Sequence, residues 1–177
     1  MTRTDRFPGR KELLPPVQQA AYEQIEARRG RVPAPYLPLL GSPGVADAFE
    51  RFSTALWDGV LTRDLQEAIF LVAARAYRCE HQWHTHEPRA LAAGVPASTI
   101  AAMKADRVPD TEEAGARLAA VIRFASVLYA QQSVPRDVFD DVAARLGGAQ
   151  LSELIAFCAL ATSISLLVNV REVPSST

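Results

Sequence analysis

Apolar residues recur every three or four positions along most of the chain, which is the spacing of helices that bury one face. Strand-like alternation is almost absent, so we predict an all-α fold. Glycines, prolines and capping residues divide the pattern into about seven helices. They are expected at residues 17–29, 45–58, 62–93, 96–103, 111–128, 135–147 and 151–170.

Several boundaries carry more specific expectations. Thr62 and Thr111 are the expected N-caps of their helices, because a threonine hydroxyl can accept a hydrogen bond from a free backbone N–H. The helix from Thr62 to Ala93 is interpreted as continuous, with Pro88 as a point that can kink or divide it. The segment 32–44 contains four prolines, so we expect it to run extended over the surface.

The 177 residues, 49% of them apolar, suffice for one core, so residues 1–177 are predicted to form a single domain. Residues 1–10 and 175–177 are expected to be mobile. No apolar run near Met1 has the character of a signal sequence. The stretch from Leu151 to Val170 approaches membrane-spanning length, but polar residues interrupt it, so we interpret it as a buried helix and predict no membrane partner.

Charge and cysteine content narrow the function classes. A net charge of -1 gives no electrostatic reason to expect nucleic acid or an anionic membrane as the partner. Two cysteines are too few for a disulfide framework and suit a reducing compartment, so we expect a cytoplasmic protein. Cys158 lies among apolar residues and is expected to be a packing residue.

All three histidines lie between His81 and His86. Successive helical residues are about 100° apart, so His81 and His84 turn away from His86 on a continuous helix. Two histidines one turn apart can hold a metal, but no third ligand accompanies them and the spacing matches no well-defined zinc motif. We predict no metal site and expect His81 and His84 on the surface or in an interface.

The other face of the same helix concentrates chemically active side chains. The projection places five residues together, namely Arg75, Cys79, Gln82, Trp83 and His86. Buried polar groups need partners, so these side chains can form a hydrogen-bonded core network in which Arg75 pairs with a carboxylate. Alternatively, they line a cavity for a small-molecule substrate.

The residues from Leu61 to Pro96 resemble the signature helix pair of carboxymuconolactone decarboxylase-like proteins, in the pattern L-T-x-x-x-x-E-x-x-x-L-V-A-A-R, then C-E-x-Q-W-x-x-H-E, then A-x-x-A-G-V-P. Arg29-Gly30, Pro35-Tyr36 and the run from Leu39 to Pro43 are similar to the N-terminal segment of one large subgroup. The resemblance covers roughly residues 14–174. It implies an alkylhydroperoxidase D-like helical bundle, with the central helix pair packed antiparallel.

One branch of this superfamily, the alkylhydroperoxidase D-like proteins, uses a C-x-x-C pair with a glutamate twelve residues before the first cysteine and a histidine four after the second. Glu67, Cys79 and His86 occupy the matching positions, but Gln82 stands where the second cysteine belongs. A glutamine cannot form a disulfide, so the dithiol cycle cannot run on this motif. The resemblance leaves a peroxidase or reductase that uses Cys79 alone, with its sulfenic acid resolved by an external thiol.

The second branch resembles lactone decarboxylases of aromatic breakdown, which carry a glutamate four residues before the histidine. Gln82 replaces that carboxylate as well. This branch implies that His86 transfers the proton and that Glu67 orients His86 or a water. It also implies that Arg75 or Arg78 contacts the substrate carboxylate and that Gln82 donates a neutral hydrogen bond. Trp83 is expected to contact the substrate.

The leading hypothesis is therefore a cofactor-independent lyase of the decarboxylase type that acts on a small carboxylated or lactone-like molecule. A thiol peroxidase or reductase based on Cys79 is the alternative from a second enzyme class. A non-catalytic helical oligomer or ligand-binding protein is the third. Relatives commonly form trimers or hexamers, so the resemblance also implies a homo-oligomer.

Overall fold

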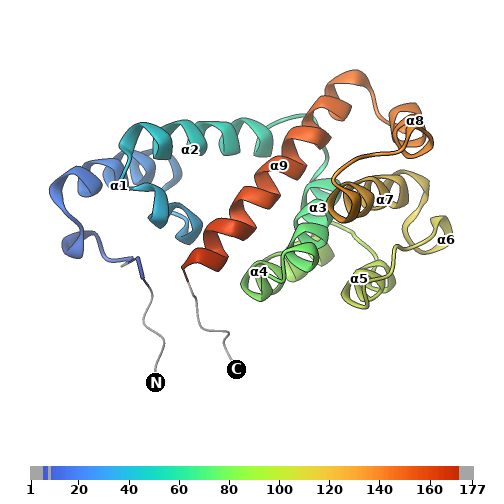
Figure 1. Ribbon diagram of the computed structural model, residues 1–177, viewed down its shortest axis with the longest axis horizontal. Helices are drawn as coiled ribbons and strands as arrows, with labels where there is room; N and C mark the ends of the chain where they lie inside the picture. Colours follow the sequence, from blue (N-terminus) through green and yellow to red (C-terminus); the bar gives the residue numbers. More distant parts are fainter. Residues whose placement is uncertain (1–5, 8, 172–177) are drawn as a thin grey trace.

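The computed structural model describes residues 6–7 and 9–171, and within this part of the chain all regular structure is helical (Figure 1). The all-α prediction is confirmed. The elements are η1 (Lys11–Leu13), α1 (Pro16–Arg29), η2 (Ala34–Leu39), α2 (Pro43–Trp57), α3 (Arg63–Ala76), α4 (Glu80–Ala92), α5 (Ala97–Lys104), α6 (Thr111–Ala114), α7 (Ala116–Gln131), α8 (Arg136–Arg145) and α9 (Gly148–Val170), where η denotes a 3-10 helix. Of the residues expected to be mobile, 1–5, 8 and 175–177 lie outside the described residues.

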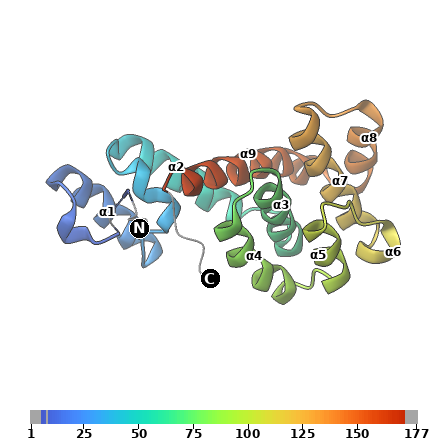
Figure 2. The same cartoon turned by 60° about the horizontal axis from the view of Figure 1, so that its bottom comes forward.

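Helix α3 is the centre of the fold. Every residue from Leu65 to Ala74 is buried, because α3 packs against α4, α7 and α9 on different sides. Figure 2 shows α1 and α2 at one end of the molecule, α3 to α8 at the other, and α9 running between them. Two polar residues, Gln66 and Glu67, fall within the buried stretch of α3, and each therefore requires a partner inside the protein.

The predicted continuous helix from Thr62 to Ala93 is wrong. The chain leaves α3 after Ala76, and α4 begins at Glu80. Arg78, in the linker between the two helices, adopts a left-handed backbone conformation with φ of 51°, which a helix cannot continue through. The N–H of Cys79 then bonds to the carbonyl of Ala74 at 2.8 Å, which closes the turn.

The turn reverses the chain, so α3 and α4 pack antiparallel as predicted. Phe70 of α3 lies beside Gln82 of α4, and Glu67 lies beside His86. Pro88 neither divides nor ends α4, which continues through it to Ala92.

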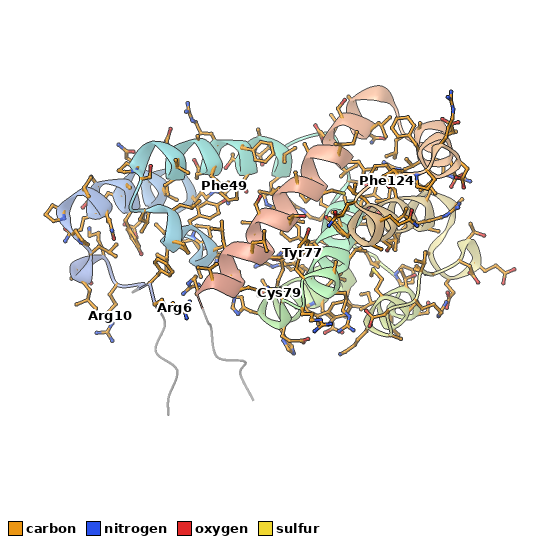
Figure 3. The ribbon with its side chains drawn as sticks, viewed as in Figure 1. Arg6, Arg10, Phe49, Tyr77, Cys79 and Phe124 are labelled. Carbon is orange, nitrogen blue, oxygen red and sulfur yellow. The ribbon has the colours of Figure 1, made fainter. Side chains whose placement is uncertain are left out.

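The proline-rich segment is not extended over the surface. It forms the 3-10 helix η2, in which Tyr36 and Leu37 are buried, followed by the fully buried Leu40. The Tyr36 ring packs edge-on against Phe49 of α2, which Figure 3 labels, with ring centres 5.5 Å apart. The fixed φ of proline suits a 3-10 turn as well as an extended chain, and the apolar residues between the prolines decide in favour of burial.

Two capping predictions also need correction. Thr62 precedes α3, but its side chain makes no capping hydrogen bond. The cap before Thr111 is Asp110, whose carboxylate accepts from the N–H groups of Glu112 and Glu113 in a capping box. The expected helix from Thr111 is divided at Gly115, whose φ of 78° ends α6 before α7 begins.

Helix α9 is the one helix of the described chain that is long and apolar enough to cross a membrane, by length and composition only. Core helices of water-soluble proteins pass the same test. Helix α9 packs against η2, α2, α3, α4 and α8, and buries one face. The prediction of a buried helix holds for that face alone, because Ile155, Leu166 and Val170 are about half exposed.

Candidate active site

A cavity of about 480 Å³ lies where five parts of the fold meet. Its walls come from the end of α1 and η2, from α2, from α3, from α4 and from the last turns of α9. The lining residues are Arg29, Arg31, Pro33, Ala34, Pro35, Tyr36, Ser53, Trp57, Arg63, Glu67, Phe70, His81, Gln82, Thr85, His86, Arg89, Ile164 and Val168. The cavity is not filled by side chains, so a small molecule has room in it.

A buried carboxylate–imidazole pair lies in the cavity wall. Glu67 Oε2 is 2.6 Å from Nδ1 of His86, and the two side chains are only 4% and 8% exposed. The His86 ring also stacks on Phe70, with ring centres 4.2 Å apart and planes 6° apart. Packing and the hydrogen bond together fix the orientation of the imidazole.

The pair also determines which nitrogen of His86 faces the cavity. Burial lowers the pKa of His86 below its ordinary value, an effect that the Glu67 carboxylate opposes, so the imidazole is neutral at pH 7. The short contact assigns the single ring proton to Nδ1, which donates to Glu67. Nε2 has no hydrogen-bond partner and is not enclosed among the described residues, so its lone pair is open to the cavity.

Gln82 lies one turn before His86 in the same wall and is 2% exposed. Its Oε1 accepts from the Ser165 hydroxyl of α9 at 3.2 Å, and its Nε2 makes a long contact of 3.5 Å with the carbonyl oxygen of Phe70. These contacts hold the amide in place. An amide nitrogen carries two hydrogens, so these contacts leave one N–H of Gln82, a residue of the cavity lining, unused.

The charged lining of the cavity is mainly positive. Four guanidinium groups, from Arg29, Arg31, Arg63 and Arg89, face it together with a single carboxylate, that of Glu67. In a chain whose net charge is -1, this concentration of arginines favours an anionic guest.

Two of these arginines flank the carboxylate–imidazole pair. Arg63 lies one turn before Glu67 in α3, and Arg89 lies one turn after His86 in α4. Because α3 and α4 run antiparallel, both arginines lie toward the same end of the pair. Arg63 rests on the face of Trp57, with its guanidinium carbon 4.6 Å from the ring centre.

Arg29 is anchored more firmly than the other three arginines. Its guanidinium bonds to the buried Glu50 at 2.9 Å and to Thr54 at 2.7 Å, and it lies 5.5 Å from the centre of the Tyr36 ring. We therefore assign Arg29 to the structure of the wall. Arg63 and Arg89 form no ion pair within the described part of the chain and remain available to an anion.

Of the candidate residues predicted from the sequence, Glu67, Gln82 and His86 meet in the cavity, and four others do not. Arg75 forms a two-pronged ion pair with Asp106 at 2.7 and 3.0 Å, on another side of α3. This is the carboxylate pairing that the structural alternative predicted. The carboxylate contact proposed for Arg75 or Arg78 has no support from the geometry, because neither residue lines the cavity: Arg75 is paired with Asp106, and Arg78 lies in the linker after α3.

Cys79 and Trp83 also lie outside the cavity lining. Cys79 is 2% exposed at the turn between α3 and α4 (Figure 3). Burial raises the pKa of its thiol, although the Gln82 backbone N–H opposes the shift. Trp83 donates its ring N–H to Glu87 at 3.0 Å. Cys158 is buried as predicted, and burial raises its pKa to about 12.

The histidine cluster divides differently from the helical-wheel expectation. His81 and His84 are both exposed, as expected, but His81 also lines the cavity together with His86, whereas His84 bonds to the carbonyl of Glu80 at 2.8 Å. Among the described residues, no group of three or more His, Cys, Asp and Glu side chains lies close enough to hold a metal ion.

The cavity arginines and the aromatic wall were not predicted from the sequence. Arg63 and Arg89 were detectable in principle, since they stand at i−4 from Glu67 and i+3 from His86 on helices already assigned. The contribution of Arg29, Arg31 and Trp57 depends on how α1, η2 and α2 fold back onto α3 and α4. No local pattern carries that information.

Comparison with known proteins shows a partial family match and a shared fold. Residues 43–126 match the sequence model of the carboxymuconolactone decarboxylase family, a region that includes Glu67, Gln82 and His86. None of the curated proteins matches the chain.

Two kinds of solved structure share the fold. A variant of the debrominase Bmp8 in complex with 2,3,4-tribromopyrrole superposes with a TM-score of 0.70 at 16% identity, over 97% of this chain and 91% of that one. A peroxidase-related protein with an alkylhydroperoxidase AhpD core, from Ralstonia eutropha JMP134, gives a TM-score of 0.65 at 20% identity, over 96% and 91%. The chain therefore resembles the carboxymuconolactone decarboxylase family over residues 43–126 and shares the fold of an alkylhydroperoxidase AhpD core.

Proposed function

We propose that this protein is a lyase of the decarboxylase type that removes carbon dioxide from a small carboxylated or lactone-like molecule. One observation carries the proposal. The Glu67–His86 pair lies in the wall of a cavity whose other charged lining groups are arginines. A hydrogen-bonded imidazole can hold and move a proton, and guanidinium groups bind carboxylates.

The residues of the chain account for each requirement of the reaction. Arg63 and Arg89 hold the carboxylate of the substrate beside His86. When the carbon–carbon bond breaks, its electron pair passes into the conjugated carbonyl of the substrate, and the N–H of Gln82 stabilises the resulting enolate oxygen. His86, in its protonated form, then delivers a proton to carbon. No step in this scheme needs a cofactor.

His86 takes this proton from solvent when the substrate binds. The free imidazole is neutral because burial lowers its pKa. A bound anion close to Nε2 favours the charged form, as any opposite charge within a few ångströms does. The anionic substrate therefore brings His86 into the state that the last step needs.

The peroxidase alternative receives less support. A single-cysteine mechanism needs a reachable thiolate, whereas Cys79 is buried outside the cavity and burial raises its pKa. The compound in complex with the debrominase variant, 2,3,4-tribromopyrrole, is a small planar ring. A fold that accepts such a ring supports a cyclic substrate for the cavity of this protein.

The direct test supplies carboxymuconolactone to the purified protein and measures release of carbon dioxide. We expect turnover by the wild type and a loss of about 100-fold or more in His86→Gln, because the proton donor is gone. His84→Gln is the matched control, since it makes the same change on an exposed residue of the same helix. Equal turnover in His86→Gln and wild type would overturn the proposal.

The arginines are tested by the Michaelis constant. Arg63→Gln and Arg89→Gln should each raise KM about tenfold or more and weaken its dependence on salt, because each loses a charged contact to the carboxylate. Arg123→Gln serves as control, because Arg123 is an exposed α7 residue that pairs with Asp137. An unchanged KM in both cavity variants would remove the arginines from substrate binding.

A further inference from the structure

We propose that the same site also removes a proton from carbon, and so isomerises unsaturated lactones that carry a hydrogen where a decarboxylase substrate carries its carboxyl group. This inference rests on the proposed function, because it uses the same acid–base pair. It adds a second reaction and a second substrate class. Three features support it: the tautomer of His86, the amide of Gln82 and the chemistry of the shared intermediate.

The first observation is the direction of the hydrogen bond to His86. Nδ1 donates to Glu67 Oε2 at 2.6 Å, so Nε2 carries the lone pair. Nε2 has no partner among the described residues, and His86 lines the cavity. A neutral imidazole held in this way is a base. In the free protein the pair is ready to accept a proton before it can give one.

The second observation is the group that can stabilise the product of proton removal. Taking a proton from the ring carbon that adjoins the carbon–carbon double bond of an unsaturated lactone leaves a conjugated enolate, whose negative charge gathers on the carbonyl oxygen. The Gln82 amide is fixed by Ser165 and by the Phe70 carbonyl, one turn from His86 in the cavity wall. Its free N–H can donate to that oxygen without prior rearrangement.

The two reactions also share an intermediate. Loss of carbon dioxide and loss of a proton from the same ring carbon give the same conjugated enolate, and both leave the electron pair of the broken bond in the carbonyl system. A cavity that stabilises this enolate lowers the barrier of either route. The routes differ only in the leaving group, which is carbon dioxide in one case and a proton taken by Nε2 in the other.

The atoms and electrons of the isomerisation balance without any co-reactant. Nε2 of His86 takes the proton from the ring carbon, and the carbon–hydrogen electron pair forms a new carbon–carbon double bond as the carbonyl becomes an enolate. Glu67 accepts the hydrogen bond of the resulting imidazolium. His86 then returns the proton to the far carbon of the conjugated system, the carbonyl re-forms and the double bond has moved.

The experiment uses the analogue of carboxymuconolactone that has hydrogen in place of the ring carboxyl group. The full-length protein is incubated with this lactone in deuterated water, and proton NMR follows both the loss of the ring C–H signal and the appearance of the isomer. We expect exchange well above the buffer rate in the wild type. His86→Gln should reduce it by about 100-fold or more, and Gln82→Leu by about 10-fold or more.

His84→Gln should leave the exchange rate unchanged, and Glu67→Gln provides a second variant of the pair that keeps the shape of the side chain. Circular dichroism confirms that each variant is folded. Exchange at the buffer rate in the wild type, or an equal rate in His86→Gln, would overturn the inference. Because carbon dioxide release from carboxymuconolactone is measured in parallel, decarboxylation without exchange refutes only this inference, whereas loss of both reactions refutes the proposed function as well.

Discussion

A methyl group added at Gly59 tests how the linker between α2 and α3 is held. An alanine Cβ at this position would overlap the carboxylate of Glu153, which belongs to α9. That carboxylate cannot move freely, because Oε1 accepts from the N–H of Val60 at 3.0 Å and Oε2 from the N–H of Leu61 at 2.8 Å. Gly59→Ala must therefore displace Glu153 and break both hydrogen bonds.

The size of the effect follows from these two bonds. A hydrogen bond to a charged group contributes about 1.5 to 3 kcal/mol, and the bond to Val60 is solvent-exposed and therefore weaker. We expect Gly59→Ala and Glu153→Ala each to lower the free energy of unfolding by about 2 to 3 kcal/mol. For a chain of this length, that corresponds to a melting temperature lower by about 4 to 12 °C.

The double variant distinguishes this explanation from independent damage. Once Glu153 is truncated, the alanine at Gly59 has nothing to overlap with, so the double variant should be no less stable than Glu153→Ala alone. The coupling free energy should therefore be about 2 kcal/mol. Urea denaturation followed by circular dichroism measures all four proteins, and Gly44→Ala, at a helical glycine with open space around it, is the control. Additive losses, or a Gly59→Ala protein as stable as the wild type, would refute the reasoning.

Four other measurements test the same structure. Because burial lowers the pKa of His86 in the folded protein, the unfolded chain takes up a proton at this residue first as the pH falls. The contribution of neutral His86 to stability is complete above about pH 6.5 and is lost as the pH falls toward the pKa of the folded state. Between pH 7.5 and 5 the melting temperature of the wild type should therefore fall by roughly a few degrees more than that of His86→Gln. Cys79 should react slowly with a maleimide in the native protein at pH 8 and rapidly in urea, whereas fast native labelling would revive the peroxidase hypothesis. Arg78→Gly should raise the free energy of unfolding by about 0.5 to 1 kcal/mol, since glycine adopts a positive φ without strain, and a destabilised variant would contradict this. The homo-oligomer implied by the family resemblance stays a prediction; sedimentation velocity should give a multiple of the 19.3 kDa chain mass, and a monomer at all concentrations would exclude it.

Most of the helices could be predicted from the sequence, because apolar periodicity and the glycines and prolines at their ends are local signals. Two of the predicted helices are each divided into two in the structure, and each break has a physical cause. At residue 115 a glycine interrupts an otherwise good helical pattern, and its φ of 78° ends α6. At Arg78 the residue type does not predict the break, because arginine is a good helix former. The packing of α4 against α3 holds it in the left-handed region.

The candidate site was predicted in part for a similar reason. Gln82 and His86 are one turn apart on α4, so the prediction that they share a face is correct although the longer predicted helix is wrong. Family resemblance identified Glu67 as a group that orients His86 or a water, and the structure places its carboxylate 2.6 Å from His86. The cation that holds a carboxylate was misplaced, because Arg75, in the last turn of α3, is paired with Asp106 and does not line the cavity.

The turn after Ala76 is what creates the chemistry. On an uninterrupted helix, Glu67 and His86 would be separated by 19 residues and hence by about 28 Å, too far for any interaction between them. The structure brings them to 2.6 Å because α4 folds back along α3. In this chain the carboxylate comes from α3 and the imidazole from α4, so Glu67 reaches one ring nitrogen while the other faces the cavity. The Glu67–His86 pair forms only because these two helices are antiparallel, so the left-handed residue Arg78, which breaks the regular pattern, is a condition for the proposed function.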